Sequence, residues 1–334
     1  MPAQLSKRYV RTRPTKALSR LVSWALVEGR PLTTRGQWIN PVVFGLQRAA
    51  LTLPLQRPVD RPIFVIGTGR SGTTVLGTVL SMHRDVAFLN EPKAVWHRIH
   101  PEEDVIGSYA NGPARFRLDA SEATPARAAV ARRLFGAYLA AVRGQRLVDK
   151  YPELVFRIPF VRALFPDARL VFLVRNGWDA CASIQNWSER LGVEQKSEVH
   201  DWWGRDDRKW HLLLDYAAAH EPDLRPIVPS LRHEADHRQR AAVEWVLAMR
   251  AGREAERAHP ECIHRVRYED FTASPDATLR TLLENVGLRD DPVCRSFAVA
   301  TLRDGQAHDA FTLRAEIAPF FHHTMERLGY MGAK

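Results

Sequence analysis

Residues 63–83 read IFVIGTGRSGTTVLGTVLSMH, and this stretch decides the fold class of the 334-residue chain. It begins with a short run of β-branched and aromatic residues, Ile63–Ile66, which predicts a buried strand. It ends with apolar residues at helical spacing over Val75–His83. A glycine-rich loop, residues 67–74, lies between them. The stretch therefore predicts a strand, a tight loop and a helix in succession.

The loop has the composition of an anion-binding site. A loop that leads from a buried strand to a helix N-terminus presents backbone N–H groups to an anion, and glycines let that backbone approach closely. Hydroxyl side chains and one guanidinium add further donors. A plain glycine turn without a ligand is the alternative interpretation. The predicted phosphate-binding residues are Thr68, Gly69, Arg70, Ser71, Gly72, Thr73 and Thr74.

The loop departs from the Walker A pattern of nucleoside-triphosphate sites. When G-x-x-x-x-G-K-[ST] is started at Gly67, the lysine position is Thr73, and the nearest cation is Arg70. A magnesium ion in such a site also needs a remote aspartate at a strand end. Asp149 is the one candidate, and Lys150 follows it at once. The sequence therefore favours a phosphate held by arginine and backbone without a metal.

A second polar group follows another predicted strand. Leu170–Val174 is five apolar residues closed by Arg175, and Ser183 comes eight residues later in a predicted helix. Open α/β sheets bind ligands at the carboxyl ends of their strands. Arg175 and Ser183 could therefore hold a second phosphate. A surface pair of Arg175 with Asp179 is the alternative.

A third polar group consists of Glu91 and Lys150. Each follows a short predicted strand, so both are expected at the same sheet edge. A carboxylate there can take a proton from an acceptor hydroxyl, and a lysine can stabilise charge on a departing oxygen. Taken alone, a Glu–Lys pair is more often a surface ion pair.

Predicted strands and helices alternate along the rest of the chain, which favours a mostly parallel sheet covered on both faces. We expect one domain with helical insertions and a helical C-terminus. The further strands are predicted at Val86–Leu89, Leu147–Val148, Leu170–Val174 and Ile263–Val266. The main helices are predicted over Pro125–Arg143, Glu153–Phe165, Trp178–Arg190, Ala235–His259 and Glu316–Leu328.

Residues 191–230 look irregular in the sequence. Five of the nine tryptophans lie between Trp178 and Trp210. Most of them are expected in the core of an insertion, but some could stack on an acceptor molecule. We expect acceptor choice to be made in this block, because the variable loops of α/β enzymes line their sites.

The positive charge is concentrated at the N-terminus. The chain has a formal net charge of +10, of which residues 1–61 carry +9 and residues 62–334 only +1. A nearly neutral domain argues against a nucleic-acid partner. Helical patterns over Ala17–Glu28 and from Asn40 to Leu53 leave two hypotheses for this basic leader. It either packs on the following domain or attaches to an anionic membrane or a lipid-like substrate.

Other features narrow the class of protein. The three cysteines are far apart, which argues against a disulfide framework and favours a reducing compartment. No apolar run reaches the length of a membrane-spanning helix, so a cytoplasmic or membrane-peripheral location is expected. His233-Glu-Ala-Asp-His237 matches the zinc signature H-E-x-x-H, but its charged surroundings favour a solvated helix start.

Together these motifs resemble those of the sulfotransferases that use 3′-phosphoadenosine-5′-phosphosulfate, PAPS. Arg70–Thr74 resembles the 5′-phosphosulfate loop of that family, and Arg175 with Ser183 resembles its 3′-phosphate motif. The spacing from Arg70 to the Leu-Asn-Glu-Pro motif at residues 89–92 is similar to that in carbohydrate and tyrosylprotein sulfotransferases. The Arg-Tyr-Glu-Asp segment at residues 267–270 resembles a C-terminal landmark of bacterial members.

The resemblance implies a P-loop-type three-layer α/β domain over residues 62–334, with residues 1–61 as the leader. It implies transfer of a sulfuryl group from PAPS to a hydroxyl of a carbohydrate, glycolipid or small molecule, leaving adenosine 3′,5′-bisphosphate, with no metal. Glu91 would be the catalytic base, and Lys150 with Arg70 would stabilise the leaving oxygen. The alternative is a P-loop nucleotide or small-molecule kinase.

Overall fold

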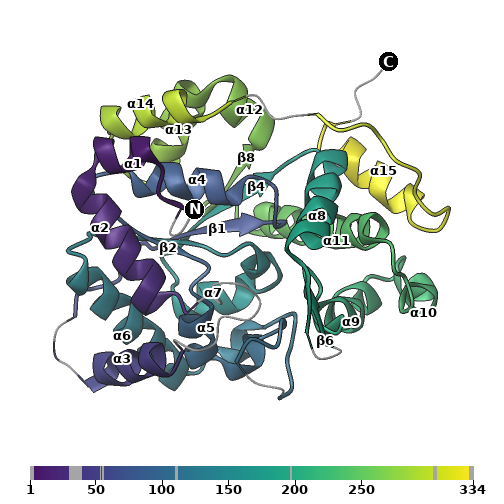
Figure 1. Ribbon diagram of the computed structural model, residues 1–334, viewed down its shortest axis with the longest axis horizontal. Coiled ribbons are helices and arrows are strands. Elements are labelled where there is room, and N and C mark those ends of the chain that lie inside the picture. Colours follow the sequence, from purple (N-terminus) through teal and green to yellow (C-terminus); the bar gives the residue numbers. More distant parts are fainter. Residues whose placement is uncertain are drawn as a thin grey trace.

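The chain is built around a parallel sheet of five strands in a computed structural model that describes residues 4–29, 40–52, 54, 56–109, 112–195, 198–303 and 307–330. The strand order is β2-β3-β1-β4-β8 (Figure 1). The residues of β1, β2 and β3, and all but the first residue of β4, are buried, as expected for a parallel sheet covered on both faces, whereas the edge strand β8 is only partly buried. The strands are β1 (Ile63–Gly67), β2 (Val86–Asn90), β3 (Arg146–Lys150), β4 (Arg169–Val174) and β8 (Ile263–Arg267).

Helices form one layer on each face of this sheet, and alternate strand residues point into the two layers. In β1, Phe64 and Ile66 belong to one apolar core, whereas Ile63 and Val65 belong to the other. The first core contains residues of α5 (Lys93–Ile99), α6 (Pro125–Ala141), α7 (Ile158–Leu164), α8 (Gly177–Leu191), α11 (His237–Ala258) and α15 (Ala318–Arg327). The second contains residues of α1 (Lys7–Thr12), α4 (Thr73–Ser81), α12 (Tyr268–Ala273), α13 (Pro275–Asn285) and α14 (Pro292–Thr301).

The predicted three-layer α/β fold is therefore confirmed, and so are the five predicted strands. The prediction of one continuous helix over Glu153–Phe165 is wrong. The structure has a 3-10 segment, η6 (Pro152–Phe156), followed by α7. Pro159 explains the break, because it has no N–H to donate to residue 155 and its ring obstructs a continuous helix.

The segment predicted to be irregular contains a small antiparallel sheet of three strands. These are β5 (Val193–Gln195), β6 (Glu198–Asp201) and β7 (Gly204–Arg205). Strands of two to four residues are too short to show an alternating pattern, which is why the sequence did not predict them. The segment continues through α9 (Arg208–Tyr216), η7 (Ala218–His220), η8 (Arg225–Ile227) and α10 (Val228–Leu231).

The N-terminal helices pack on the domain that follows. They are α1, α2 (Pro14–Val22), the π-helical segment η2 (Ser23–Val27) and α3 (Asn40–Thr52). The hydroxyl groups of Tyr9 and Ser81 are 2.8 Å apart in the interior. Arg13 Nη2 donates to both carboxylate oxygens of Asp291, at 2.7 and 2.8 Å. A boundary at residue 61 remains a prediction, and the predicted helix end at Leu53 lies outside the described residues.

No helix in the described ranges combines the length and the apolar character that a membrane crossing requires.

Candidate active site

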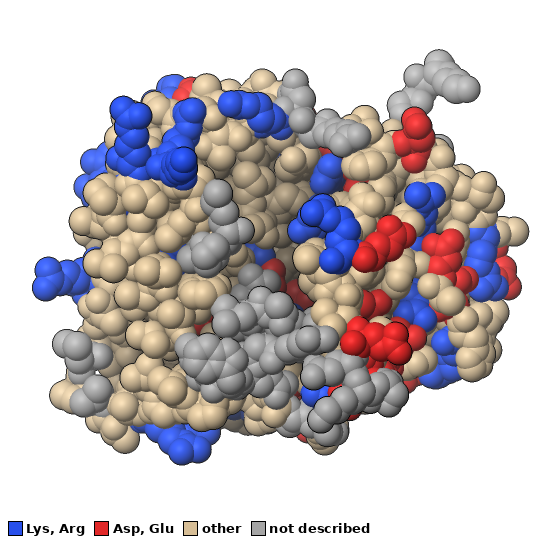
Figure 2. Space-filling model, in the orientation of Figure 1, with Lys and Arg blue, Asp and Glu red and all other residues tan. Residues whose placement is uncertain are grey.

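The polar groups singled out in the sequence converge on one cavity of about 1020 Å³. It lies at the carboxyl ends of the central strands, and Figure 2 shows the hollow between the two halves of the molecule. Its loop end is formed by Gly69, Arg70, Gly72, Thr73, Thr74, Arg175, Ser183 and Tyr268. The remainder, here called the tryptophan end, includes Lys93, Glu153, Trp187, Asp201, Trp202 and Lys209.

The glycine loop takes a conformation that other residues would strain or block. Gly72 has φ +93°, and a Cβ atom there would lie 2.3 Å from the ring of Tyr268. A Cβ atom on Gly69 would lie 2.4 Å from the ring of Trp202. Arg70 itself has φ +67°, in the left-handed region that non-glycine residues rarely adopt. Such strain clusters at functional sites, and here it turns a guanidinium into the cavity.

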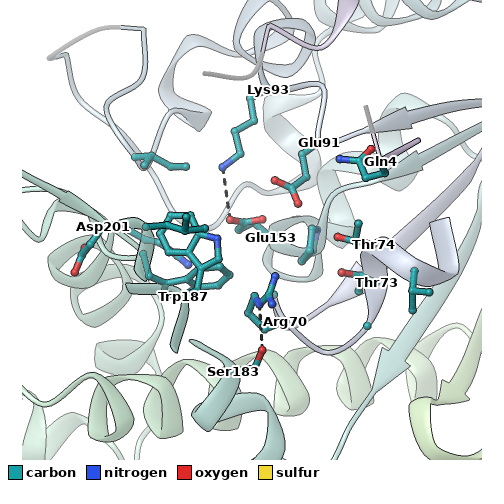
Figure 3. Close-up of a pocket in the computed structure, with 18 of the residues that line it drawn as sticks. Gln4, Arg70, Thr73, Thr74, Glu91, Lys93, Glu153, Ser183, Trp187 and Asp201 are labelled. Atoms are coloured by element: carbon teal, nitrogen blue, oxygen red, sulfur yellow. Dashed lines mark hydrogen bonds and ion pairs between the residues drawn. The ribbon is translucent and has the colours of Figure 1, made fainter. Parts of the chain in front are cut away.

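The loop presents hydrogen-bond donors that suit an anion. Gly72 is the N-cap residue of α4 and supplies no capping side chain, so the first-turn amides of the helix are not satisfied by a cap. The hydroxyl groups of Thr68 and Ser71 are buried and have no hydrogen-bond partner among the described residues. Thr73 and Thr74 open the helix and line the cavity (Figure 3). A phosphate or sulfate group fits this arrangement.

Two arginines lie side by side at the loop end. Arg70 Nε donates to Ser183 Oγ at 3.1 Å, and Arg175 Nη1 donates to the Arg70 carbonyl at 3.1 Å. The Arg175 guanidinium stacks on Tyr268, 4.5 Å from the ring centre. Burial, together with the charge of Arg175, lowers the pKa of Arg70 from its ordinary value. Two neighbouring guanidinium groups of this kind form a site for an anion with several negative oxygens.

The alternative role of Arg175, a surface pair with Asp179, is not what the structure shows. Asp179 Oδ1 accepts a hydrogen bond from the backbone N–H of His308 at 2.7 Å. Arg175 is only 8% exposed and points toward the loop end. Arg175 therefore contacts the glycine loop, and Asp179 contacts the segment at His308.

Glu91 and Lys150 form an ion pair at the edge where β2 and β3 end. The register of the two strands pairs Asn90 with Lys150, and the Glu91 N–H donates to the Lys150 carbonyl at 2.7 Å. Glu91 has φ +53°, a second strained residue at the cavity wall. Its carboxylate points into the cavity from the side opposite Arg70 (Figure 3). A carboxylate and an ammonium group are thus held together by backbone pairing.

The tryptophan end was not predicted residue by residue. Lys93 Nζ lies 3.8 Å from Glu153 Oε1 across the cavity (Figure 3). Burial acts to raise the pKa of Glu153, but the charges of Lys93 and Lys209 outweigh it and lower that pKa overall. The indoles of Trp187 and Trp202 meet edge to face, with centres 5.4 Å apart. Trp187 and Trp202 belong to the tryptophan-rich block that the sequence analysis singled out, whereas the charged residues of this end were not predicted.

The N-terminal segment also supports the site, which the sequence analysis missed. Glu28 is fully buried and paired with Arg20 at 2.6 Å. Its carboxylate accepts the N–H of Asn90 at 2.7 Å, directly before Glu91. Trp24, from the same segment, lines the cavity. A signal was present, because Glu28 is the only acidic residue before Asp60.

Two residues of the H-E-x-x-H match contact other parts of the protein. His237 accepts a hydrogen bond from the Trp203 indole at 2.8 Å, and Glu234 pairs with Arg314 at 2.9 Å. In the part of the chain that the structure describes, no group of three or more His, Cys, Asp or Glu side chains is arranged to hold a metal ion.

Several known proteins are similar to this chain. The sulfotransferase domain from the curacin biosynthetic pathway is 14% identical, with a TM-score of 0.47 over 82% of this chain and 99% of that domain. Sulfotransferase STF1 from Mycobacterium tuberculosis H37Rv is 17% identical, with a TM-score of 0.48 over 97% of this chain and 92% of STF1.

Relatives by sequence cover part of the chain. Nodulation protein NoeE of Sinorhizobium fredii is 29% identical over 138 residues, which are 39% of this chain and 32% of NoeE. The match thus spans about a third of the length of NoeE. A model of the sulfotransferase family matches residues 62–228, half of the chain, and includes the glycine loop, Glu91, Lys150, Arg175 and Ser183. The chain therefore belongs to the sulfotransferase family.

Proposed function

We propose that this sulfotransferase moves a sulfuryl group from PAPS to a hydroxyl of an acceptor, with Glu91 as the base. One observation carries the proposal. The glycine loop, the Arg175–Ser183 group and the Glu91–Lys150 pair come from different strand ends and line or border one cavity. Each group alone could have a purely structural role. Their position around one cavity would supply two anion sites and a base.

The loop end fits the donor. Amides of the glycine loop, the Arg70 guanidinium and the hydroxyls of Thr73 and Thr74 would hold the 5′-phosphosulfate. Arg175 and Ser183 would hold the 3′-phosphate, which distinguishes PAPS from ATP. The bound donor supplies an activated sulfuryl group on a phosphate leaving group.

The Glu91–Lys150 pair fits the transfer step. Glu91 takes the proton of the acceptor hydroxyl while the acceptor oxygen forms its bond to sulfur. The bond between sulfur and the bridging phosphate oxygen breaks, and that oxygen keeps the electron pair. Lys150 and Arg70 stabilise the charge that develops on it. Positioning and electrostatics supply the catalysis, as they do in phosphoryl transfer.

The tryptophan end fits the acceptor. It combines apolar indole faces with charged groups, namely Trp187 and Trp202 beside Lys93 and Glu153. Such a wall suits a molecule with both apolar faces and hydroxyl groups. We therefore propose a carbohydrate, a glycolipid or a small molecule with a hydroxyl as the acceptor class.

The test is a comparison of ligands by thermal unfolding of the full chain. Adenosine 3′,5′-bisphosphate at about 100 times its dissociation constant should stabilise the protein by about 2.7 kcal/mol. The gain should vanish in Arg175→Ala and persist in Arg280→Ala, a matched arginine exposed on α13. Stabilisation by ATP with Mg²⁺ and not by the bisphosphate would overturn the proposal in favour of a kinase.

A further inference from the structure

The helix formed by α2 and η2 has its apolar side turned outward. Its buried residues include Arg20 and Ser23, and Ala17 is its one buried apolar residue. A helix that only packs on a domain shows the opposite pattern, with its apolar face inward. The exposed large apolar residues here are Leu18 (65% exposed), Leu21 (43%), Val22 (37%) and Leu26 (39%).

The neighbouring helix α3 shows a weaker form of this pattern, because it buries Val43 and packs Leu51 on the core while it exposes other apolar residues. It packs against η2 and exposes Val42 and Leu46. It buries Asn40 and Gln47, and the Gln47 amide has no hydrogen-bond partner among the described residues. Burying polar groups while exposing leucine and valine lowers stability unless something covers the outer face.

This pattern is local to the N-terminal helices. Among the described residues, eleven large apolar side chains are exposed, and seven of them lie between Val10 and Leu46. Scattered exposed leucines are normal on any protein, but a concentration on adjacent helices marks an interaction surface. We call this surface, formed by Leu18, Leu21, Val22, Leu26, Val42 and Leu46, the leader face.

Charge identifies what the leader face would contact. Lys7, Arg8 and Arg11 are exposed on α1, and Arg48 is exposed on α3. Glu28, one of the two acidic residues before position 62, is fully buried in its pair with Arg20. Figure 2 shows blue side chains over α1 beside a tan surface over α2, where no red is visible among the described residues. Apolar helix faces flanked by cations match an anionic lipid surface.

We propose that the leader face docks this protein on an anionic membrane. Leu18, Leu21 and Leu26 enter the boundary between headgroups and acyl chains, and the flanking cations contact lipid phosphates. Trp24 lies between these leucines in the chain and lines the cavity, so docking brings the cavity mouth close to the lipid headgroups. The proposal does not depend on the sulfuryl-transfer chemistry.

Binding to vesicles tests the proposal directly. Co-sedimentation of the full chain should occur with phosphatidylcholine vesicles that contain about a third phosphatidylglycerol, and much less with pure phosphatidylcholine. Leu18→Gln with Leu21→Gln should lower the partition coefficient by about tenfold or more. Val299→Gln, which removes an exposed apolar residue of α14 outside the leader face, should leave it unchanged.

A fluorescent label gives a second readout that needs no disruptive variant. The three native cysteines are buried, so a label reacts selectively at Leu18→Cys. Its emission should shift to the blue on addition of the anionic vesicles, whereas a label at His323→Cys on the distant helix α15 should not respond (Figure 1). No vesicle binding, or binding that survives the double glutamine variant, would overturn the proposal. A dimer in lipid-free solution that this variant dissociates would overturn it too, since a second copy would then cover the face.

Discussion

The two ends of the cavity are built in different ways. The loop end is assembled mainly from one continuous segment, residues 67–74, to which Arg175 after β4, Ser183 of α8 and Tyr268 of α12 are added. The tryptophan end takes its side chains from α5, η6, α8, the β6–β7 turn and α9, which are spread over more than a hundred residues. The first is specified by local backbone chemistry, whereas the second exists only after the chain has folded.

This difference explains what could be predicted. The loop end can be predicted because its features come from residues that are neighbours in the chain. These features are a glycine at φ +93°, a helix without a side-chain cap and an arginine within the loop. The contact between Lys93 and Glu153 could not be predicted in this way, because the two residues are 60 positions apart and each alone resembles an ordinary surface residue. Glu91 and Lys150 lie between these extremes, since the shared edge of parallel strands brings them together.

The fold was predictable for a related reason. Strands β1, β2 and β4 are buried and read as nearly continuous apolar runs, so their existence could be predicted. Strands β3 and β8 contain fewer apolar residues, and β8 is only partly buried. The small sheet of β5, β6 and β7 could not be predicted, because its strands are short and half exposed. The leader helices were predicted from their periodicity, but the periodicity could not show that the apolar side faces outward.

The largest expected effect is that of replacing Glu91, whose carboxylate faces the cavity just after β2. Glu91→Gln keeps the size of the side chain but removes the proton acceptor, so kcat should fall by about 10²- to 10⁴-fold. Binding of adenosine 3′,5′-bisphosphate should stay within about twofold of the wild type, because the loop end is intact. Parallel turnover assays and calorimetric titrations measure the two quantities. A kcat close to that of the wild type would remove Glu91 from the role of base.

A smaller fall in kcat should follow from replacing Glu28, which lies outside the cavity. Glu28→Gln leaves the Arg20 guanidinium buried without its charge partner, which costs about 3–5 kcal/mol of folding free energy. It also weakens the acceptor of the Asn90 N–H, so Glu91 should lose alignment and kcat should drop more than KM rises. Chemical denaturation and steady-state kinetics on the same sample measure both effects.

The matched control for Glu28 is the exposed pair of Arg280 with Asp276 on α13. Arg280→Met should cost at most about 1 kcal/mol, because water screens an exposed pair. If both variants lowered stability equally and neither changed kcat, Glu28 would be an ordinary fold-stabilising residue with no effect on the site.

The smallest expected effect is at the tryptophan end, and it should depend on pH. Glu153→Gln removes one charge from the tryptophan end. If this end binds the acceptor as proposed, KM for the acceptor should rise by about tenfold while kcat changes little. The charges of Lys93 and Lys209 lower the pKa of Glu153 in the folded protein despite its burial. A carboxyl whose pKa is lower in the folded than in the unfolded state stabilises the fold at pH values above its unfolded pKa of about 4.3, and this stabilisation is lost as the pH falls. The free energy of unfolding should therefore differ between wild type and variant near neutral pH, and the difference should shrink on acidification. A difference that stays constant with pH would show that Glu153 contributes packing, and that the tryptophan end owes its charge to other residues.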